Sequence, residues 1–152
     1  MVEEGAPAPD FTLMSDSGEP VTLSSLRGKA VILYFYPKDD TPGCTTEACE
    51  FRDAYDVFRD RGAEILGVSP DSEASHVKFK SKYQLPFTLL ADPEHEVAEK
   101  YGVWGERSFA GKKYLGINRS TFVIDADGNV ARAMMGIKPA GHAEEVIEAL
   151  PS

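Results

Sequence analysis

The chain of 152 residues contains only two cysteines, three histidines and one tryptophan, and it has no long hydrophobic run. Its longest apolar segment, AVILYFY at residues 30–36, is far too short for a transmembrane helix, so we expect no membrane partner. Basic residues are scarce: 16 Lys and Arg against 25 Asp and Glu give a formal net charge of −9, which argues against a nucleic-acid partner. The three histidines are scattered without ligand spacing, so no zinc or other metal site is indicated.

The first residues, MVEEG, contain neither a basic region nor an apolar region, so no secretory signal is predicted. We therefore expect a cytoplasmic location. In that compartment two cysteines are more often catalytic or metal-binding than structural.

The hydrophobic pattern predicts an α/β protein. No repeat, low-complexity tract or linker interrupts it, so we expect a single domain over residues 1–152. The expected elements are strand pairs at 11–13 with 21–23 and at 121–124 with 130–133, strands at 30–36, 63–69 and 88–91, and helices from the cysteines to Gly62, from Ser69-Pro70 to 85, at 93–101 and at 141–150. Residues 104–118 are expected to form a Gly-rich loop. This order predicts a thioredoxin-like fold, a mixed central β-sheet flanked by helices with an N-terminal β-hairpin extension.

The two cysteines, Cys44 and Cys49, fall at the start of the helix that follows the first buried strand. If Thr41 caps this helix, Pro42 takes the first helical position and Cys44 lies in the first turn. Free backbone N–H groups and the positive end of the helix dipole then favour a thiolate at Cys44. Cys49 lies more than one turn further along, so Cys44 is the expected nucleophile.

The spacing also bears on whether the two thiols can meet. Residues five apart on an ideal helix differ by about 140° around the axis, and their Cα atoms lie roughly 8.6 Å apart. A disulfide needs a Cα separation of about 4.4–6.8 Å. If Cys44 and Cys49 couple, the first turns of the helix must therefore unwind.

Several interpretations of the pair remain open at this point. The cysteines could be two buried structural residues, although the Pro/Gly turn before them disfavours this. A thiol–disulfide exchanger would normally carry C-x-x-C, whereas the spacing here is C-x-x-x-x-C. A redox-sensing or chaperone-like protein, in which oxidation exposes an apolar surface, is the alternative outside enzymes.

The pattern Pro37-x-x-x-Thr41-x-x-Cys44 resembles the active-site signature of peroxiredoxins, thiol peroxidases on a thioredoxin-like fold. A second cysteine five residues later resembles the Q type, also called the bacterioferritin comigratory protein subfamily, an atypical two-cysteine group. Further segments resemble the family in order along the chain: APDFTL at 8–13, GVSPDS at 67–72, YGVWGE at 101–106 and RSTFVID at 119–125.

The resemblance implies a role for each matching residue. Cys44 would be the peroxidatic cysteine and Cys49 the resolving cysteine. Thr41 would hydrogen-bond the peroxide, Pro37 would shield the thiolate from water, and Arg119 would stabilise the charge of the thiolate and of the transition state. The resemblance further implies a hydroperoxide substrate, no cofactor, thioredoxin or a similar dithiol reductant, and a monomer or weak homodimer.

Five other residues could bear on the site. Glu47, one turn after Cys44, is expected either to organise the site or to be an ordinary carboxylate near a helix N-terminus. Trp104 is expected in the core rather than near the active-site loop. His76, His95 and His142 are expected on the surface, because a preformed thiolate needs no catalytic base.

Overall fold

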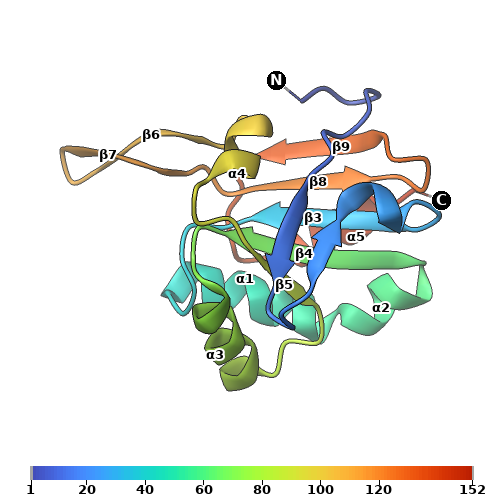
Figure 1. Ribbon diagram of the computed structural model, residues 1–152, viewed down its shortest axis with the longest axis horizontal. Coiled ribbons are helices and arrows are strands. Elements are labelled where there is room, and N and C mark those ends of the chain that lie inside the picture. Colours follow the sequence, from blue (N-terminus) through green and yellow to red (C-terminus); the bar gives the residue numbers. More distant parts are fainter. Residues whose placement is uncertain (1, 152) are drawn as a thin grey trace.

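The computed structural model describes residues 2–151, and its main feature is one seven-stranded mixed sheet (Figure 1). The strand order is β2-β1-β5-β4-β3-β8-β9. These strands are β1 (Thr12–Ser15), β2 (Pro20–Thr22), β3 (Ala30–Phe35), β4 (Ala63–Ser69), β5 (Thr88–Ala91), β8 (Ser120–Ile124) and β9 (Val130–Met135). The fold class is confirmed, including the β1–β2 hairpin at the N-terminal end.

Strand β3 lies inside the sheet between two neighbours, parallel to β4 and antiparallel to β8. Its residues after Ala30 are buried, as expected for a strand covered on both faces. Because side chains alternate along a strand, Ile32 and Tyr34 enter one hydrophobic core, and Leu33 and Phe35 enter another on the opposite face.

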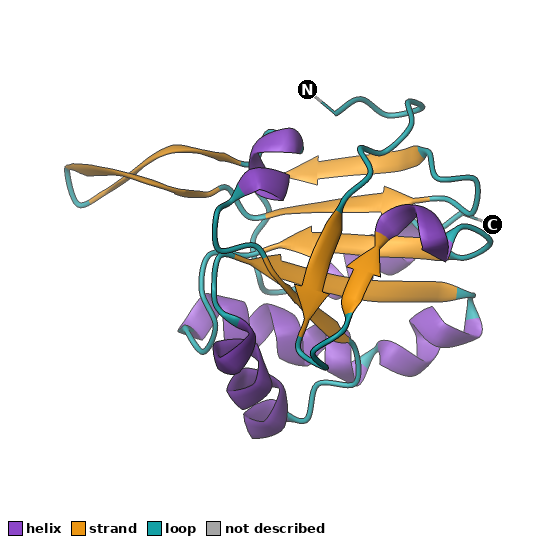
Figure 2. Cartoon of the chain, viewed as in Figure 1, coloured by secondary structure: helices purple, strands orange, loops and turns teal. Residues whose placement is uncertain are grey.

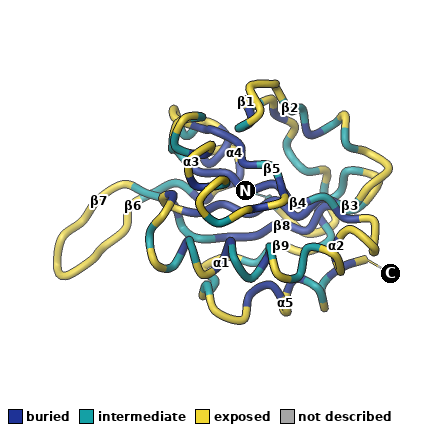
Figure 3. Tube along the Cα trace, turned by 90° about the horizontal axis from the view of Figure 1, so that it is seen from below, coloured by how far each residue is buried: buried dark blue, intermediate teal, exposed yellow. Residues whose placement is uncertain are grey.

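Helices cover both faces of the sheet (Figure 2). Residues from α1 (Pro42–Asp53), α2 (Tyr55–Asp60), α3 (Glu73–Tyr83) and α5 (His142–Glu148) enter the first core, whereas those from the short 3₁₀ helix η1 (Leu23–Leu26) and from α4 (Glu96–Lys100) enter the second. In Figure 3 the buried trace follows the central strands and the inner sides of these helices. No helix within residues 2–151 is both long and apolar enough to cross a membrane.

Two helix boundaries differ most from the sequence prediction. The helix that begins at Pro42 does not run on to Gly62 but ends at Asp53, and α2 begins at Tyr55 after the junction residue Ala54. The next helix is capped not by Ser69 but by Ser72, whose hydroxyl accepts a hydrogen bond from Ser75 N at 3.1 Å. Ser69 is still the last residue of β4.

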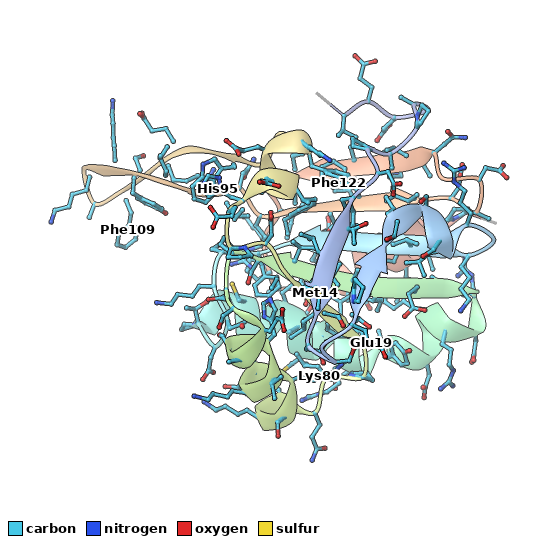
Figure 4. All side chains as sticks on the ribbon, in the orientation of Figure 1. Met14, Glu19, Lys80, His95, Phe109 and Phe122 are labelled. Carbon is cyan, nitrogen blue, oxygen red and sulfur yellow. The ribbon has the colours of Figure 1, made fainter. Side chains whose placement is uncertain are left out.

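The segment expected as a loop at 104–118 forms a second, two-stranded sheet. Strands β6 (Trp104–Phe109) and β7 (Lys112–Ile117) pair antiparallel and project from the body of the protein (Figure 1). Ala110 and Gly111 form the tip with φ values of +53° and +81°, the positive pair that a tight two-residue hairpin turn requires. Phe109 is 77% exposed and points away from the body (Figure 4).

Candidate active site

Three neighbouring strands, β4, β3 and β8, bring the site residues together at one end of the sheet. Phe35, the last residue of β3, pairs with Val68 of the parallel strand β4 and with Ser120, the first residue of the antiparallel strand β8. The segment that leads from β3 into α1 therefore meets the β4–α3 turn and the residue just before β8, which is Arg119. Cys44 and Arg119 are brought together in this way.

The N-terminus of α1 has the expected order of residues. Thr41 is the N-cap, with extended backbone angles, and Pro42 is the first helical residue. The Thr41 side chain does not cap the helix; its hydroxyl donates to Lys38 O at 2.8 Å, and its oxygen can still accept a hydrogen bond. The first helical bond runs from Thr45 N to Thr41 O at 2.8 Å, so the N–H groups of Gly43 and Cys44 precede it and have no acceptor within the helix.

Cys44 lies beside a guanidinium group. Its side chain is 1% exposed, and Arg119 Nη2 donates to Cys44 Sγ at 3.4 Å. Arg119 Nη1 donates at 2.7 Å to Oε1 of Glu47, which lies one turn further along α1. Burial would lower the pKa of Arg119, but the neighbouring Cys44 and Glu47 raise it, so the guanidinium stays charged. The thiol thus faces the positive end of a helix and a fixed cation, both of which favour a thiolate.

Glu47 is the third member of this group, and it is buried. Burial raises its pKa to about 7, although Arg119 pulls in the opposite direction. Its second oxygen, Oε2, has no hydrogen-bond partner. Of the two alternatives from the sequence, the contact with Arg119 favours the one in which Glu47 organises the site.

The two other residues expected in the site, Cys49 and Pro37, are not part of the group formed by Cys44, Arg119 and Glu47. Cys49 is half-buried within the same helix as Cys44, and both thiols are free, so the helix keeps them apart in this conformation. Pro37 is exposed at the start of the segment between β3 and α1.

The expectation that the three histidines lie on the surface is wrong for two of them. His76 and His142 are both fully buried, because each has polar partners inside the protein. His142 Nε2 lies 2.7 Å from the hydroxyl of Thr121, and burial lowers the pKa of this histidine. The third, His95, is half-exposed and stacks on Trp104 with ring centroids 3.9 Å apart, so Trp104 packs against α4 at the base of the hairpin.

Sequence reasoning missed a polar cluster formed by the buried Asp39 and His76 and the half-buried Asp71. The helical spacing of His76 with Phe79 and Tyr83 was the signal that could have placed this histidine on the inner face of α3. Within residues 2–151 this cluster is the one group of at least three acidic, His or Cys side chains whose atoms could hold a metal, with ligand atoms within 4.8 Å of one another. Hydrogen bonds within the protein already engage these atoms, and we assign no metal to them.

Known proteins resemble the chain over nearly its whole length. The family model described as "AhpC/TSA family" matches residues 5–133. Peroxiredoxin Bcp of Bacillus subtilis (strain 168) is 50% identical over 149 residues, which are 98% of this chain and 95% of the relative. Peroxiredoxin Bcp of Escherichia coli (strain K12) is 44% identical over 146 residues, which are 96% of this chain and 94% of the relative.

Solved structures agree with these relatives. The bacterioferritin comigratory protein of Xanthomonas campestris, described for its alkyl peroxide reduction activity, superposes with a TM-score of 0.90 at 38% identity and covers 97% of this chain and 96% of its own. A mutant of PrxQ from Xylella fastidiosa superposes with a TM-score of 0.92 at 34% identity and covers 97% of this chain and 94% of its own. The chain belongs to the AhpC/TSA family and, within it, to the Bcp/PrxQ peroxiredoxins.

Proposed function

We propose that this peroxiredoxin reduces hydrogen peroxide and small organic hydroperoxides through Cys44, forms an intrachain disulfide with Cys49 and is recycled by thioredoxin or a similar dithiol protein. The observation that carries the proposal is the contact of Arg119 with Cys44 Sγ at the N-terminus of α1. The alkyl peroxide reduction named for the Xanthomonas campestris protein supports organic hydroperoxides as substrates.

In the first step the Cys44 thiolate attacks the terminal oxygen of the hydroperoxide. An S–O bond forms as the O–O bond breaks, and the leaving alkoxide or hydroxide takes a proton to become an alcohol or water. Arg119 and the free N–H groups of the first helical turn stabilise the negative charge that moves from sulfur to oxygen. The Thr41 hydroxyl hydrogen-bonds the peroxide, and Pro37 shields the thiolate. The product is a sulfenic acid on Cys44.

In the second step the Cys49 thiolate attacks the Cys44 sulfur. An S–S bond forms as the S–O bond breaks, and the leaving hydroxide takes a proton to become water. Both residues belong to α1, so its first turns unwind to bring the sulfurs within bonding distance. The dithiol protein then reduces the disulfide and becomes oxidised itself. The cycle uses no cofactor, and we propose that the chain carries it out as a single domain, as a monomer or weak homodimer, in the cytoplasm.

Two cysteine variants test these roles. In an assay that couples peroxide reduction to thioredoxin, thioredoxin reductase and NADPH, Cys44→Ser is expected to abolish turnover. Cys49→Ser is expected to keep the first oxidation and to accumulate a sulfenic acid on Cys44, which dimedone traps for mass spectrometry. Peroxidase activity retained in Cys44→Ser would refute the assignment.

The same assay separates the alternatives. Repeated turnover with excess peroxide supports an enzyme. A single oxidation without turnover would instead favour a redox sensor, for which the two cysteines within one helix supply a conformational change. Reduction of insulin disulfides without any response to peroxide would favour a thiol–disulfide exchanger.

A further inference from the structure

Asp39, five residues before Cys44, lies at the centre of a buried hydrogen-bonded network. The hydroxyl of Tyr36 donates to its Oδ1, and the hydroxyl of Ser75 donates to its Oδ2 at 2.8 Å. Nδ1 of His76 lies 2.7 Å from the same Oδ2. The side chains of Asp39 and His76 are 3% and 0% exposed. The reaction steps described above use neither of these two residues.

The hydrogen-bond partners of His76 indicate that Asp39 and His76 share a proton and act together. Nε2 of His76 lies 2.9 Å from Leu90 O, and a carbonyl oxygen only accepts, so Nε2 carries a hydrogen. One further proton then lies between Nδ1 and the carboxyl group of Asp39. Removing either partner leaves a buried polar group without its match, which is costly in a dry interior.

The main chain of Asp39 is held as firmly as its side chain. Asp39 N donates to Oδ2 of Asp71 at 2.8 Å, and the hydroxyl of Ser69 donates to the same oxygen at 2.7 Å. The segment between β3 and α1 is thereby bound to the end of β4, to the start of α3 and, through His76, to β5. Pro37 and Thr41 lie two residues on either side of this fixed point.

Helix α3 also holds the chain beyond the second cysteine. Arg52 Nη1 donates to Tyr83 O, at the end of α3, with a distance of 2.8 Å. Both cysteines lie between the two attachments, at Asp39 and Arg52. Within this interval, the carboxylate of Asp40 also accepts hydrogen bonds from α3, from Lys82 and Tyr83. The side chains of Cys44 and Glu47 bond to Arg119, and Glu50 accepts from Gly141 N. Thr46 bonds only within its own helix, to Pro42 O.

We propose that Asp39 and His76 are positioning residues of the peroxidase. The buried pair fixes residues 37–41 on α3, so that Pro37 and Thr41 keep their reactive positions, and it confines the unwinding of α1 to the interval between Asp39 and Arg52. This inference rests on the proposed function, because it assigns a purpose to the fixed loop beside Cys44. The pair acts through the loop and touches no substrate.

The test compares two rate constants in the variants Asp39→Asn and His76→Gln. Rapid-quench mass spectrometry gives the second-order rate constant for oxidation of Cys44 and the first-order rate constant for disulfide formation. We expect oxidation to be about tenfold slower, because a displacement of about 1 Å in a reactive loop costs this much or more. Disulfide formation keeps its rate or becomes faster, since the loop is less constrained. The double variant is expected to match the single variants, because the pair acts as a unit.

Asp16→Asn is the matched control. Asp16 binds Lys80 of the same helix α3 at 2.7 Å and accepts from Leu89 N, but it lies in the β1–β2 turn (Figure 4 labels Lys80). This variant is expected to lower the thermal stability while leaving the oxidation rate unchanged. If Asp39→Asn and His76→Gln also lower only the stability, or slow both rate constants equally, the pair is merely structural and the inference fails.

Hydrogen exchange of the reduced protein tests the fixed loop without any peroxide chemistry. Amides at 38–41 are expected to exchange faster in Asp39→Asn and His76→Gln than in the parent protein and in Asp16→Asn. Unchanged exchange there overturns the inference even if the protein is an active peroxidase. A parent protein whose Cys44 does not react with peroxide overturns the proposed function instead, and the exchange data still decide whether the pair fixes the loop.

Discussion

The guanidinium of Arg119 donates hydrogen bonds to two acidic side chains at once, those of Cys44 and Glu47. The planar guanidinium can serve both at once, which a lysine ammonium at the same place could not do with the same geometry. Since the pKa of Glu47 is raised to about 7, this carboxyl group changes its charge near neutral pH. When Glu47 is protonated, Arg119 loses the opposite charge of this carboxylate.

The raised pKa of Glu47 predicts a pH-dependent stability. The folded protein keeps the Glu47 proton up to about pH 7, whereas the unfolded chain loses it near the ordinary glutamate pKa of 4.5. Between these values the folded state binds more protons, so the free energy of unfolding contributed by this group falls as the pH rises, by up to about 1.4 kcal/mol per pH unit. Glu47→Gln has no proton to lose and is expected to lack this decline.

Urea unfolding at several pH values between 4.5 and 7 measures the effect. The difference in unfolding free energy between Glu47→Gln and the parent protein should grow in favour of the variant as the pH rises. Glu148→Gln, at an exposed position of α5, controls for the loss of one negative charge. Parallel curves for the parent and Glu47→Gln would show that burial does not hold the Glu47 proton.

At the scale of elements, the first turn of α1 is packed closely against the residue that precedes β8. A Cβ atom on Gly43 would lie 3.2 Å from Arg119 Nη2 and 3.3 Å from Pro139 Cγ. Both distances are tighter than ordinary van der Waals contact, so a side chain here must displace a neighbour. Gly43 is thus the residue that lets the helix and the guanidinium approach each other.

Gly43→Ala is therefore expected to slow the oxidation of Cys44 by about tenfold, because it shifts Arg119 away from the sulfur. The same change favours the helix, since alanine has the higher helix propensity, so thermal stability should not account for the loss. Stopped-flow oxidation by hydrogen peroxide measures the rate. Gly105→Ala is the control, because a Cβ atom there meets nothing within 4 Å. Equal rates in all three proteins would exclude close packing as the reason for glycine at position 43.

How well an element could be predicted from the sequence depended on its burial. The apolar runs at β3 and β4 are buried on both faces of the sheet, and the sequence alone places them correctly. Strands β6 and β7 are almost entirely exposed, so no apolar alternation indicates them, and their turn is Ala-Gly rather than the Asn-Gly that signals a hairpin. The break at Ala54 has no glycine or proline to mark it.

The residues of the site could likewise be predicted from the sequence only in part. The motif placed Cys44, Thr41 and Arg119 because their spacing along the chain follows the order of β3, α1 and β8. The Asp39–His76 pair joins residues 37 positions apart, and nothing local to either residue indicates the other. Tertiary contacts alone identify such a pair, although the helical spacing of His76 with Phe79 and Tyr83 could have indicated that the histidine is buried.

At the scale of the whole molecule, the protein consists of a sheet with a hydrophobic core on each face and of the β6–β7 hairpin. Most of the hairpin contributes no side chain to either core. Residues 106–115 are all exposed, and the root of the hairpin, at Ile117, is the part that reaches the second core (Figure 3). Phe122 of β8 is the contrasting aromatic residue, fully buried against Phe35 and Tyr101 (Figure 4). The hydrophobic effect therefore predicts unequal contributions of the two regions to stability.

Shortening the hairpin tests this division. Arg107 and Tyr114 are cross-strand partners, so replacing residues 108–113 by Asn-Gly joins them through a tight turn. The melting temperature is expected to change by only a few degrees, because no buried surface is lost, and Cys44 should keep its oxidation rate, since Arg119 lies beyond the buried root. Phe122→Ala, by contrast, should lose about 3–5 kcal/mol of unfolding free energy. Circular dichroism melts of both proteins make the comparison, and a shortened hairpin that unfolds as readily as Phe122→Ala would show that the exposed strands support the core after all.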